Sequence, residues 1–134
     1  MSVKKTMNII ITATGQTLES EIDPRFGRCK YFILINPETM KYTAIPNEST
    51  MASGGAGIQA AQQVVNTHAT TVITGNIGPN AHRTLTAANI TIITGATGTI
   101  QQTIQHYNNN KLHPQTTPTV DSHHGINTPG GTTE

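Results

Sequence analysis

The sequence contains few of the residues with which proteins bind nucleic acids. Charged residues make up only 11% of the 134 positions, and the formal net charge is +1. This balance gives no basic surface for a phosphate backbone. Tryptophan is absent and aromatic residues reach only 4%, which leaves too few rings for a surface on which bases stack. These totals argue against a nucleic-acid-binding function.

Cysteine and long apolar runs are also scarce. The single cysteine, Cys29, excludes an internal disulfide framework. No run approaches the roughly 18 apolar residues of a membrane-spanning helix. The apolar run after Lys4 and Lys5 is too short and too rich in threonine for a signal peptide. We therefore expect one cytoplasmic domain with a single core, preceded by a short flexible leader at residues 1–6.

Acidic residues are missing from the positions where a metal-dependent nuclease needs them. Such enzymes hold two metal ions with clustered carboxylates on their strands, but residues 8–13 and 70–74 contain none. Glu19, Glu21 and Asp23 all fall in one connection. No Ser-His-Asp or Cys-His arrangement and no phosphate-binding P-loop is recognisable. We therefore expect a binding protein and not an enzyme.

The sequence does contain a repeated pattern of apolar strands that end in Thr and Gly. Residues 72–80 predict a strand, a Gly/Asn turn and a helix that Pro79 opens. Similar strand ends occur at 10–15 and 92–98. If these strands are parallel, their loops all lie at the carboxyl edge of the sheet, where open α/β sheets bind ligands. The pattern predicts a site made mostly of backbone N–H groups and small polar side chains.

Hydrophobic periodicity predicts five strands and three helices within residues 7–112. The expected strands are Asn8–Thr12, Tyr31–Asn36, Met40–Ile45, Thr70–Thr74 and Ile90–Thr94. The expected helices are one that follows Gly57 and ends near Thr67, then Pro79–Ala88 and Gly98–Tyr107. Right-handed crossovers place the fourth and fifth strands parallel to the first, and a turn at 36–39 makes the second and third a hairpin. We therefore predict an α/β fold with a five-stranded mixed sheet in the order 3-2-1-4-5, flanked by three helices.

The composition changes at His113. From there to Glu134, Pro, Thr, Gly and His dominate, and such a segment cannot bury enough surface to offset its ordering entropy. We expect residues 113–134 to form a disordered tail. His113, with the pair His123 and His124, is at most a weak candidate for loose metal binding.

The glycine-rich segment Ser53–Gly57 precedes the first expected helix. A helix start carries free N–H groups and a partial positive charge, and glycines let a ligand approach the backbone. The spacing matches only half of a dinucleotide-binding fingerprint, because no acidic residue follows about 20 positions later. Anion or cluster binding is the favoured interpretation, and the alternative is a flexible loop that closes onto the helix. The turn 74–80 also precedes a helix, so anion or cluster binding is an interpretation for it too. The alternative is that this turn is a tight connection whose geometry needs glycine.

Two side chains are candidate metal ligands. Cys29 lies between Arg28 and Lys30, which would lower the pKa of the thiol if they are close in space. The alternative is that Cys29 is a small apolar residue at the start of the second strand. His82 lies in the first turn of the second expected helix, where it faces the site or, as the alternative, lies on the surface.

Five segments stand out in this order: Thr12-Ala13-Thr14-Gly15, Asp23-Pro24-Arg25-Phe26-Gly27-Arg28-Cys29, Met51-Ala52-Ser53-Gly54-Gly55-Ala56-Gly57-Ile58-Gln59-Ala60-Ala61, Thr74-Gly75-Asn76-Ile77-Gly78-Pro79-Asn80-Ala81 and Gly95-Ala96-Thr97-Gly98-Thr99. Together they resemble the dinitrogenase iron–molybdenum cofactor biosynthesis family. The resemblance spans about residues 7–112. It implies a ribonuclease H-like fold and a carrier or assembly role for metal–sulfur clusters, with no turnover.

The family includes small stand-alone proteins from anaerobes and archaea. The resemblance implies an iron–molybdenum or related metal–sulfur cluster as cofactor, since some members bind the iron–molybdenum cofactor or its precursor and one branch holds a molybdenum–copper sulfide cluster. Such clusters are anionic and suit a ring of helix N-termini, glycine loops and arginines. The implied partners are cofactor-assembly or nitrogenase-related proteins. His82 stands where many relatives have an aromatic residue, so the resemblance leaves its role open.

The candidate site combines the matched loops. The expected cofactor-binding residues are Thr14, Gly15, Arg25, Arg28, Ser53, Gly54, Gly55, Gly57, Gly75, Asn76, Gly78, Asn80, Thr97 and Gly98, and the expected metal ligands are Cys29 and His82. Two other functions stay open. One is a nucleotide- or phosphate-binding module that uses the same glycine loops, and the other is a protein-interaction module whose tail recruits a partner.

Overall fold

The computed structural model describes residues 7–51 and 55–112. The expectations for the leader at 1–6 and the tail at 113–134 lie outside the described residues. Within the described part of the chain, no helix is long and apolar enough to cross a membrane.

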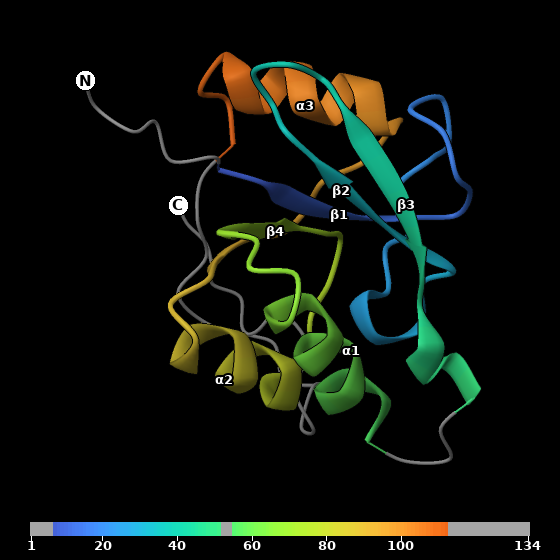
Figure 1. The fold of residues 1–134 in the computed structure, drawn as a ribbon, viewed down its shortest axis with the longest axis vertical. Helices are drawn as coiled ribbons and strands as arrows, with labels where there is room; N and C mark the ends of the chain where they lie inside the picture. Colours follow the sequence, from blue (N-terminus) through green and yellow to red (C-terminus); the bar gives the residue numbers. More distant parts are fainter. Residues whose placement is uncertain (1–6, 52–54, 113–134) are drawn as a thin grey trace, which may run out of the picture.

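The protein is built on a five-stranded mixed sheet (Figure 1). Its strands are β1 (Ile9–Ala13), β2 (Tyr31–Ile35), β3 (Tyr42–Pro46), β4 (Thr71–Ile73) and β5 (Thr91–Ile93). The order is β3-β2-β1-β4-β5. Strands β1, β2 and β3 are antiparallel neighbours, whereas β4 is parallel to both β1 and β5. The predicted topology is therefore confirmed.

Helices cover both faces of the sheet, as Figure 1 shows. Helices α1 (Ala56–Val65) and α2 (Pro79–Ala87) lie on one face, and α3 (Ile100–Asn108) lies on the other. The central strand β1 is buried at all five positions, because its side chains alternate between two apolar clusters. Ile10 packs on the side of α1 and α2, and Ile11 packs on the side of α3.

Strand β3 is an edge strand. Tyr42 and Thr43 are exposed, while Ala44 and Ile45 are half-buried. The burial does not alternate along the strand, but the position of β3 at the edge agrees with the predicted strand order.

Two helices begin at positions that differ from those expected. Helix α1 begins at Ala56, because Gly55 takes a left-handed conformation with φ of 72° and ends the loop. Helix α3 begins at Ile100, because Thr99 caps it. The Thr99 hydroxyl accepts a hydrogen bond from the Gln102 N–H at 3.1 Å, and the Gln102 side chain accepts from the Thr99 N–H at 3.0 Å. This reciprocal capping box satisfies two N–H groups at the start of α3.

Two short 3₁₀ helices, η1 (Phe26–Arg28) and η2 (Glu48–Met51), occur in the connections that precede β2 and α1. Neither of these short helices is among the elements that the hydrophobic periodicity predicts. Helix η1 packs on the first turn of α1, where the candidate site lies.

Candidate functional site

The segment 23–29 is attached to the start of α2 by backbone contacts. The Asn76 N–H donates to the Pro24 carbonyl at 2.7 Å, and the Phe26 N–H donates to the Asn76 carbonyl at 3.3 Å. A Cβ atom on Gly75 would lie only 2.7 Å from Pro24 Cα. Glycine is therefore needed at position 75 for the two segments to approach so closely.

The same segment also touches the start of α1. A Cβ atom on Gly27 would lie 3.1 Å from Gly57 Cα and 3.2 Å from Gly57 N, so the two backbones are in direct contact. Phe26 anchors segment 23–29 to the core. The residue is 2% exposed, and its ring centroid lies 5.8 Å from that of Phe32 on β2. Segment 23–29 thus lies between the first turns of α1 and α2.

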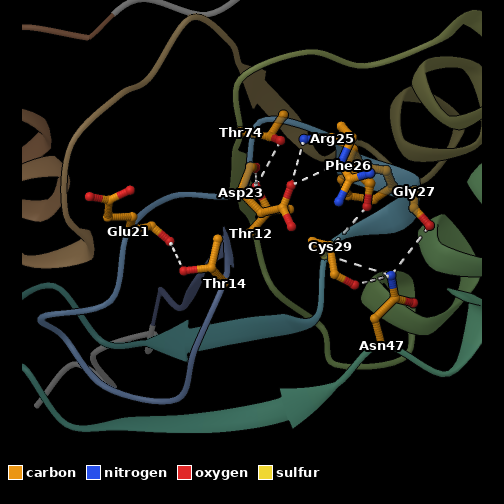
Figure 2. Close-up of polar contacts among 10 residues, drawn as sticks. All are labelled: Thr12, Thr14, Glu21, Asp23, Arg25, Phe26, Gly27, Cys29, Asn47 and Thr74. Carbon is orange, nitrogen blue, oxygen red and sulfur yellow. Dashed lines mark hydrogen bonds and ion pairs between the residues drawn. The ribbon is translucent and has the colours of Figure 1, made fainter.

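A buried hydroxyl pair ties this segment to the two central strands (Figure 2). Thr12 Oγ1 donates to the Asp23 carbonyl at 2.7 Å and lies 2.8 Å from the Thr74 hydroxyl. The Asp23 N–H donates back to the Thr12 carbonyl at 3.0 Å. Both threonine residues are fully buried, so these hydrogen bonds form in an environment where losing one is costly.

A hollow of about 210 Å³ opens between the starts of α1 and α2. Most of its lining comes from backbone and small side chains. The lining residues are Phe26, Gly27, Gly55, Ala56, Gly57, Ile58, Asn76, Gly78, Pro79, Asn80 and Ala81. We call it the helix-start hollow.

The electrostatics of the helix-start hollow favour an anion. The N-cap residues of α1 and α2 are Gly55 and Gly78, and neither helix start has a side-chain cap. No side chain therefore caps the first N–H groups of α1 or those that follow Pro79 in α2, and each helix dipole adds a partial positive charge. None of the described lining residues is acidic. Arg83 adds a positive charge beside the hollow, since its Nη1 atom lies 3.5 Å from Asn80 Oδ1.

A larger hollow of about 590 Å³ lies at the opposite edge of the sheet. It is formed where α1 and α2 end, with Asn66 and Asn89 among its lining residues. Helix ends present free carbonyl groups and a partial negative charge, so this hollow is unsuited to an anion.

Several predicted site residues meet at the helix-start hollow. Gly55, Gly57, Asn76, Gly78 and Asn80 all line it. The remaining predicted residues of segments 23–29 and 74–80 lie next to these lining residues. Gly75 lies beneath them against Pro24, Arg25 forms a parallel backbone bridge with Asn76, and Arg28 is exposed at the end of η1. Ser53 and Gly54 lie outside the described residues.

Four predicted site residues do not join this group. The Thr14 side chain and N–H donate to the Glu21 carbonyl, and Gly15 packs against Ser20. Thr97 lines a separate hollow of about 100 Å³ on the side of α3, and the Gly98 carbonyl accepts from the Ile22 N–H. The structure therefore does not bring Thr14, Gly15, Thr97 and Gly98 to the helix-start hollow, and their role in cofactor binding stays a prediction. Thr97 and Gly98 lie apart from the hollow because α3 covers the opposite face of the sheet, and the start of α3 is already capped.

The expectation that neighbouring cations lower the pKa of Cys29 is also wrong. Cys29 is fully buried, its thiol donates to the Phe26 carbonyl at 3.4 Å, and an Asn47 N–H approaches its sulfur at 3.6 Å. Burial, followed by the nearby Asp23 charge, raises the pKa of the Cys29 thiol from 9.0 to about 12. Cys29 is thus a neutral core residue here, as in its alternative interpretation, and is not placed to bind a metal at the hollow.

His82 is buried, with 9% of its surface exposed. It does not belong to the lining of the helix-start hollow, and its Nε2 atom has no hydrogen-bond partner in the described part of the chain. The alternative of a surface histidine is therefore wrong. Between residues 7–51 and 55–112, no group of three or more His, Cys, Asp or Glu side chains is arranged to hold a metal ion.

Sequence reasoning missed three residues that shape the site. Asp23 is 3% exposed and lies under Arg25. Asn47 donates to the Cys29 carbonyl at 2.8 Å and so holds the end of η1 (Figure 2). Arg83 was detectable, because a residue three positions after Asn80 lies on the same helix face. The buried roles of Asp23 and Asn47 have no comparable signal in the sequence.

Comparisons with known proteins agree with this fold. The sequence profile of the dinitrogenase iron–molybdenum cofactor family matches residues 7–110. The apo form of the orange protein from Desulfovibrio gigas is 32% identical with a TM-score of 0.83, covering 88% of this chain and all of that chain. A candidate NifB protein from Thermotoga is 30% identical with a TM-score of 0.74, covering 85% of this chain and 97% of that chain. An uncharacterized protein from Methanocaldococcus jannaschii is 27% identical over 96 residues, 69% of this chain and 81% of its own length. The chain belongs to the dinitrogenase iron–molybdenum cofactor family.

Proposed function

We propose that this protein binds an anionic metal–sulfur cluster as cargo in the helix-start hollow and carries it. The observation that supports this most directly is the pair of helix starts without side-chain caps, Gly55 and Gly78, on one glycine-rich hollow. Backbone N–H groups at such positions bind anions without any charged side chain. Membership of the family makes an iron–molybdenum or related cluster the favoured cargo.

The residues present fit a cluster that brings its own sulfide ligands. Cys29 is buried with its pKa raised to about 12, so it is not available as a thiolate at the hollow. The lining offers hydrogen bonds from backbone N–H groups, and its glycines let a ligand come close to the backbone. We therefore propose that the protein holds its cargo by hydrogen bonds and helix dipoles and adds no ligand to the metal.

The size of the hollow favours an inorganic anion over a nucleotide. Pockets for larger organic ligands measure about 300–1,000 Å³, whereas the helix-start hollow measures about 210 Å³. The nucleotide alternative therefore has less support than the cluster. A recruiting role for the tail lies outside the described residues.

The proposed role is that of a carrier without catalytic turnover, acting in the cytoplasm. Delivery to cofactor-assembly or nitrogenase-related proteins is part of this proposal. We also propose that the fold is ribonuclease H-like, and the observed strand order supports this classification.

The first test is anaerobic purification of the untagged protein, with its visible absorption spectrum and elemental analysis for Fe, Mo and Cu. Colour with near-stoichiometric metal and sulfide would support the proposal. A protein that is colourless, and stays so with tetrathiomolybdate or iron–sulfur precursors, would contradict it.

A matched pair of variants tests the location. A Cβ atom on Gly55 meets nothing within 4 Å, and Asn and Asp tolerate its positive φ better than other side chains. Gly55→Asp adds a negative charge at the rim, whereas Gly55→Asn adds the same shape without it. We expect Gly55→Asp to bind tetrathiomolybdate at least tenfold more weakly than Gly55→Asn. Equal affinities of the two variants would place the cargo elsewhere.

A further inference from the structure

Asp23 is a buried carboxylate whose partner is the exposed Arg25. The Asp23 residue is 3% exposed, and acidic side chains are almost never so deeply buried unless they are paired. Its Oδ1 atom accepts from the Arg25 backbone N–H at 3.1 Å and from Arg25 Nε at 3.4 Å (Figure 2). One carboxylate oxygen thus holds both the backbone and the side chain of Arg25.

This contact uses only the inner nitrogen of the guanidinium group. The Arg25 side chain is 66% exposed, and among residues 7–51 and 55–112 its two terminal nitrogens contact no acceptor. A guanidinium group carries five N–H donors in one plane. Anchoring at Nε therefore leaves the terminal fork, the part that pairs best with anions, oriented and open.

The main chain of Arg25 lies beside the helix-start hollow, although Arg25 is not one of the lining residues. Arg25 forms a parallel bridge with Asn76, which lines the hollow. Pro24 and Phe26, on either side of Arg25, make the hydrogen bonds to Asn76 described above. The main chain of Arg25 is therefore fixed next to a residue that lines the hollow, and Asp23 fixes how the side chain leaves that main chain.

We propose that Asp23 is a positioning residue that orients Arg25 toward the anionic cargo. The inference rests on the proposed function and adds to it a residue that never touches the cargo. Its physical basis is that a side chain ordered before binding loses less conformational entropy on binding. A carboxylate next to an anion site would otherwise be unfavourable, because like charges repel.

Positioning and simple electrostatics predict opposite signs for one substitution. Asp23→Asn keeps an oxygen that accepts from the Arg25 N–H, so the turn is retained, but it removes the charge that holds Nε. If Asp23 acted only through its charge, removing it would strengthen anion binding. If Asp23 positions Arg25, the same change weakens binding.

The experiment is a titration of the full-length protein with tetrathiomolybdate, followed by visible absorption, in two backgrounds. In the natural background we expect Asp23→Asn to bind about three- to tenfold more weakly, as for the loss of a charge-assisted hydrogen bond. In an Arg25→Ala background we expect Asp23→Asn to cause no further loss. Glu21→Gln removes a charge from an exposed neighbour in the same connection and serves as the control, for which we expect equal or slightly tighter binding.

Two outcomes of the titration would overturn the inference. Tighter binding by Asp23→Asn would show a purely electrostatic role, and equal weakening in both backgrounds with a lower melting temperature would show a structural one. The ¹⁵N relaxation of Arg25 Nε, measured without any anion, separates this inference from the proposed function. We expect an ordered Nε–H that becomes mobile in Asp23→Asn. If the protein binds no thiomolybdate, the proposed function fails, while a mobile Arg25 in the unmodified protein would by itself refute positioning by Asp23.

Discussion

Replacing Gly75 by alanine tests how tightly segment 23–29 is joined to the start of α2. The added Cβ atom would lie 2.7 Å from Pro24 Cα, 2.9 Å from Pro24 Cβ and 3.0 Å from the Pro24 carbonyl oxygen. None of these atoms belongs to a flexible side chain, so the two segments must separate to make room. The hydrogen bond from the Asn76 N–H to Pro24, at 2.7 Å, is the first contact that such a separation breaks.

The size of the effect follows from three contributions. Overpacking of this kind costs about 1–3 kcal/mol, and each lost hydrogen bond costs about 1 kcal/mol net. The smaller entropy of an unfolded chain with alanine offsets about 0.4–1 kcal/mol. We therefore expect Gly75→Ala to lower the free energy of unfolding by about 1–4 kcal/mol, and the melting temperature by about 4 °C or more.

The matched control is the same substitution at Gly57. There the added Cβ atom would lie 3.6 Å from Ala81 Cβ and 3.9 Å from Ala81 N, which is ordinary van der Waals contact. Because Gly57 lies within α1, alanine gains up to about 1 kcal/mol of helix propensity. Urea unfolding and thermal melts of both variants measure the difference. Equal stability of Gly75→Ala and the natural protein, or the same response at both glycines, would refute the close packing argued here.

Three further predictions concern buried polar groups. His82→Phe removes an Nε2 atom without a partner in the described part of the chain, and we expect it to raise the free energy of unfolding by about 1 kcal/mol; a loss in urea unfolding would show that Nε2 has a partner. The pKa of Cys29 is raised to about 12 in the folded protein, so its contribution to stability is complete below about pH 9 and is lost as the pH rises from 9 to 12. The decrease in the free energy of unfolding over this pH range should be smaller in Cys29→Ala. Identical pH profiles of the two proteins would contradict the burial of the thiol. Thr12→Val leaves the Thr74 hydroxyl and the Asp23 carbonyl without their buried partner, so we expect a loss of about 1–3 kcal/mol in the free energy of unfolding. Thr12→Ser keeps the hydroxyl and should largely avoid this loss. A larger loss for Thr12→Ser than for Thr12→Val in chemical denaturation would assign the effect to packing.

The strand order was predictable because it follows from local patterns and one rule of handedness. The continuous apolar run of β1 indicates a strand buried on both faces, which places it centrally in the sheet. Right-handed crossovers then place β4 and β5 parallel to β1, with β4 next to β1 and β5 next to β4. Each of these signals depends on residues that are close in sequence.

The face covered by α3 was not predictable in the same way. The crossover rule applies only to a helix between two parallel strands, and no strand follows α3 within the described residues. Because Thr97 and Gly98 share the pattern of Thr and Gly, the sequence alone groups them with the other loops, and it contains no signal that α3 covers the opposite face. The cap at Thr99 was also missed, although Thr followed three residues later by Gln is a known start signal.

The errors at Cys29 and His82 have a common cause. Arg28 and Lys30 are neighbours of Cys29 in the sequence, but both are exposed while Cys29 points into the core. The pKa of a thiol depends on burial as well as on nearby charge, and burial is a property of the folded chain. His82 is similar, because its burial depends on how α2 packs and not on its position within the helix.

The contrast between the capped start of α3 and the uncapped starts of α1 and α2 has a consequence for amide hydrogen exchange. The N–H groups that begin α3 are bound by Thr99 and Gln102 and should be protected whether or not cargo is present. The first N–H groups of α1 and α2 lack side-chain caps, and should exchange rapidly until an anion occupies them. Amide exchange at the starts of α1 and α2 would thus report the binding of cargo, and exchange at the start of α3 would serve as an internal reference.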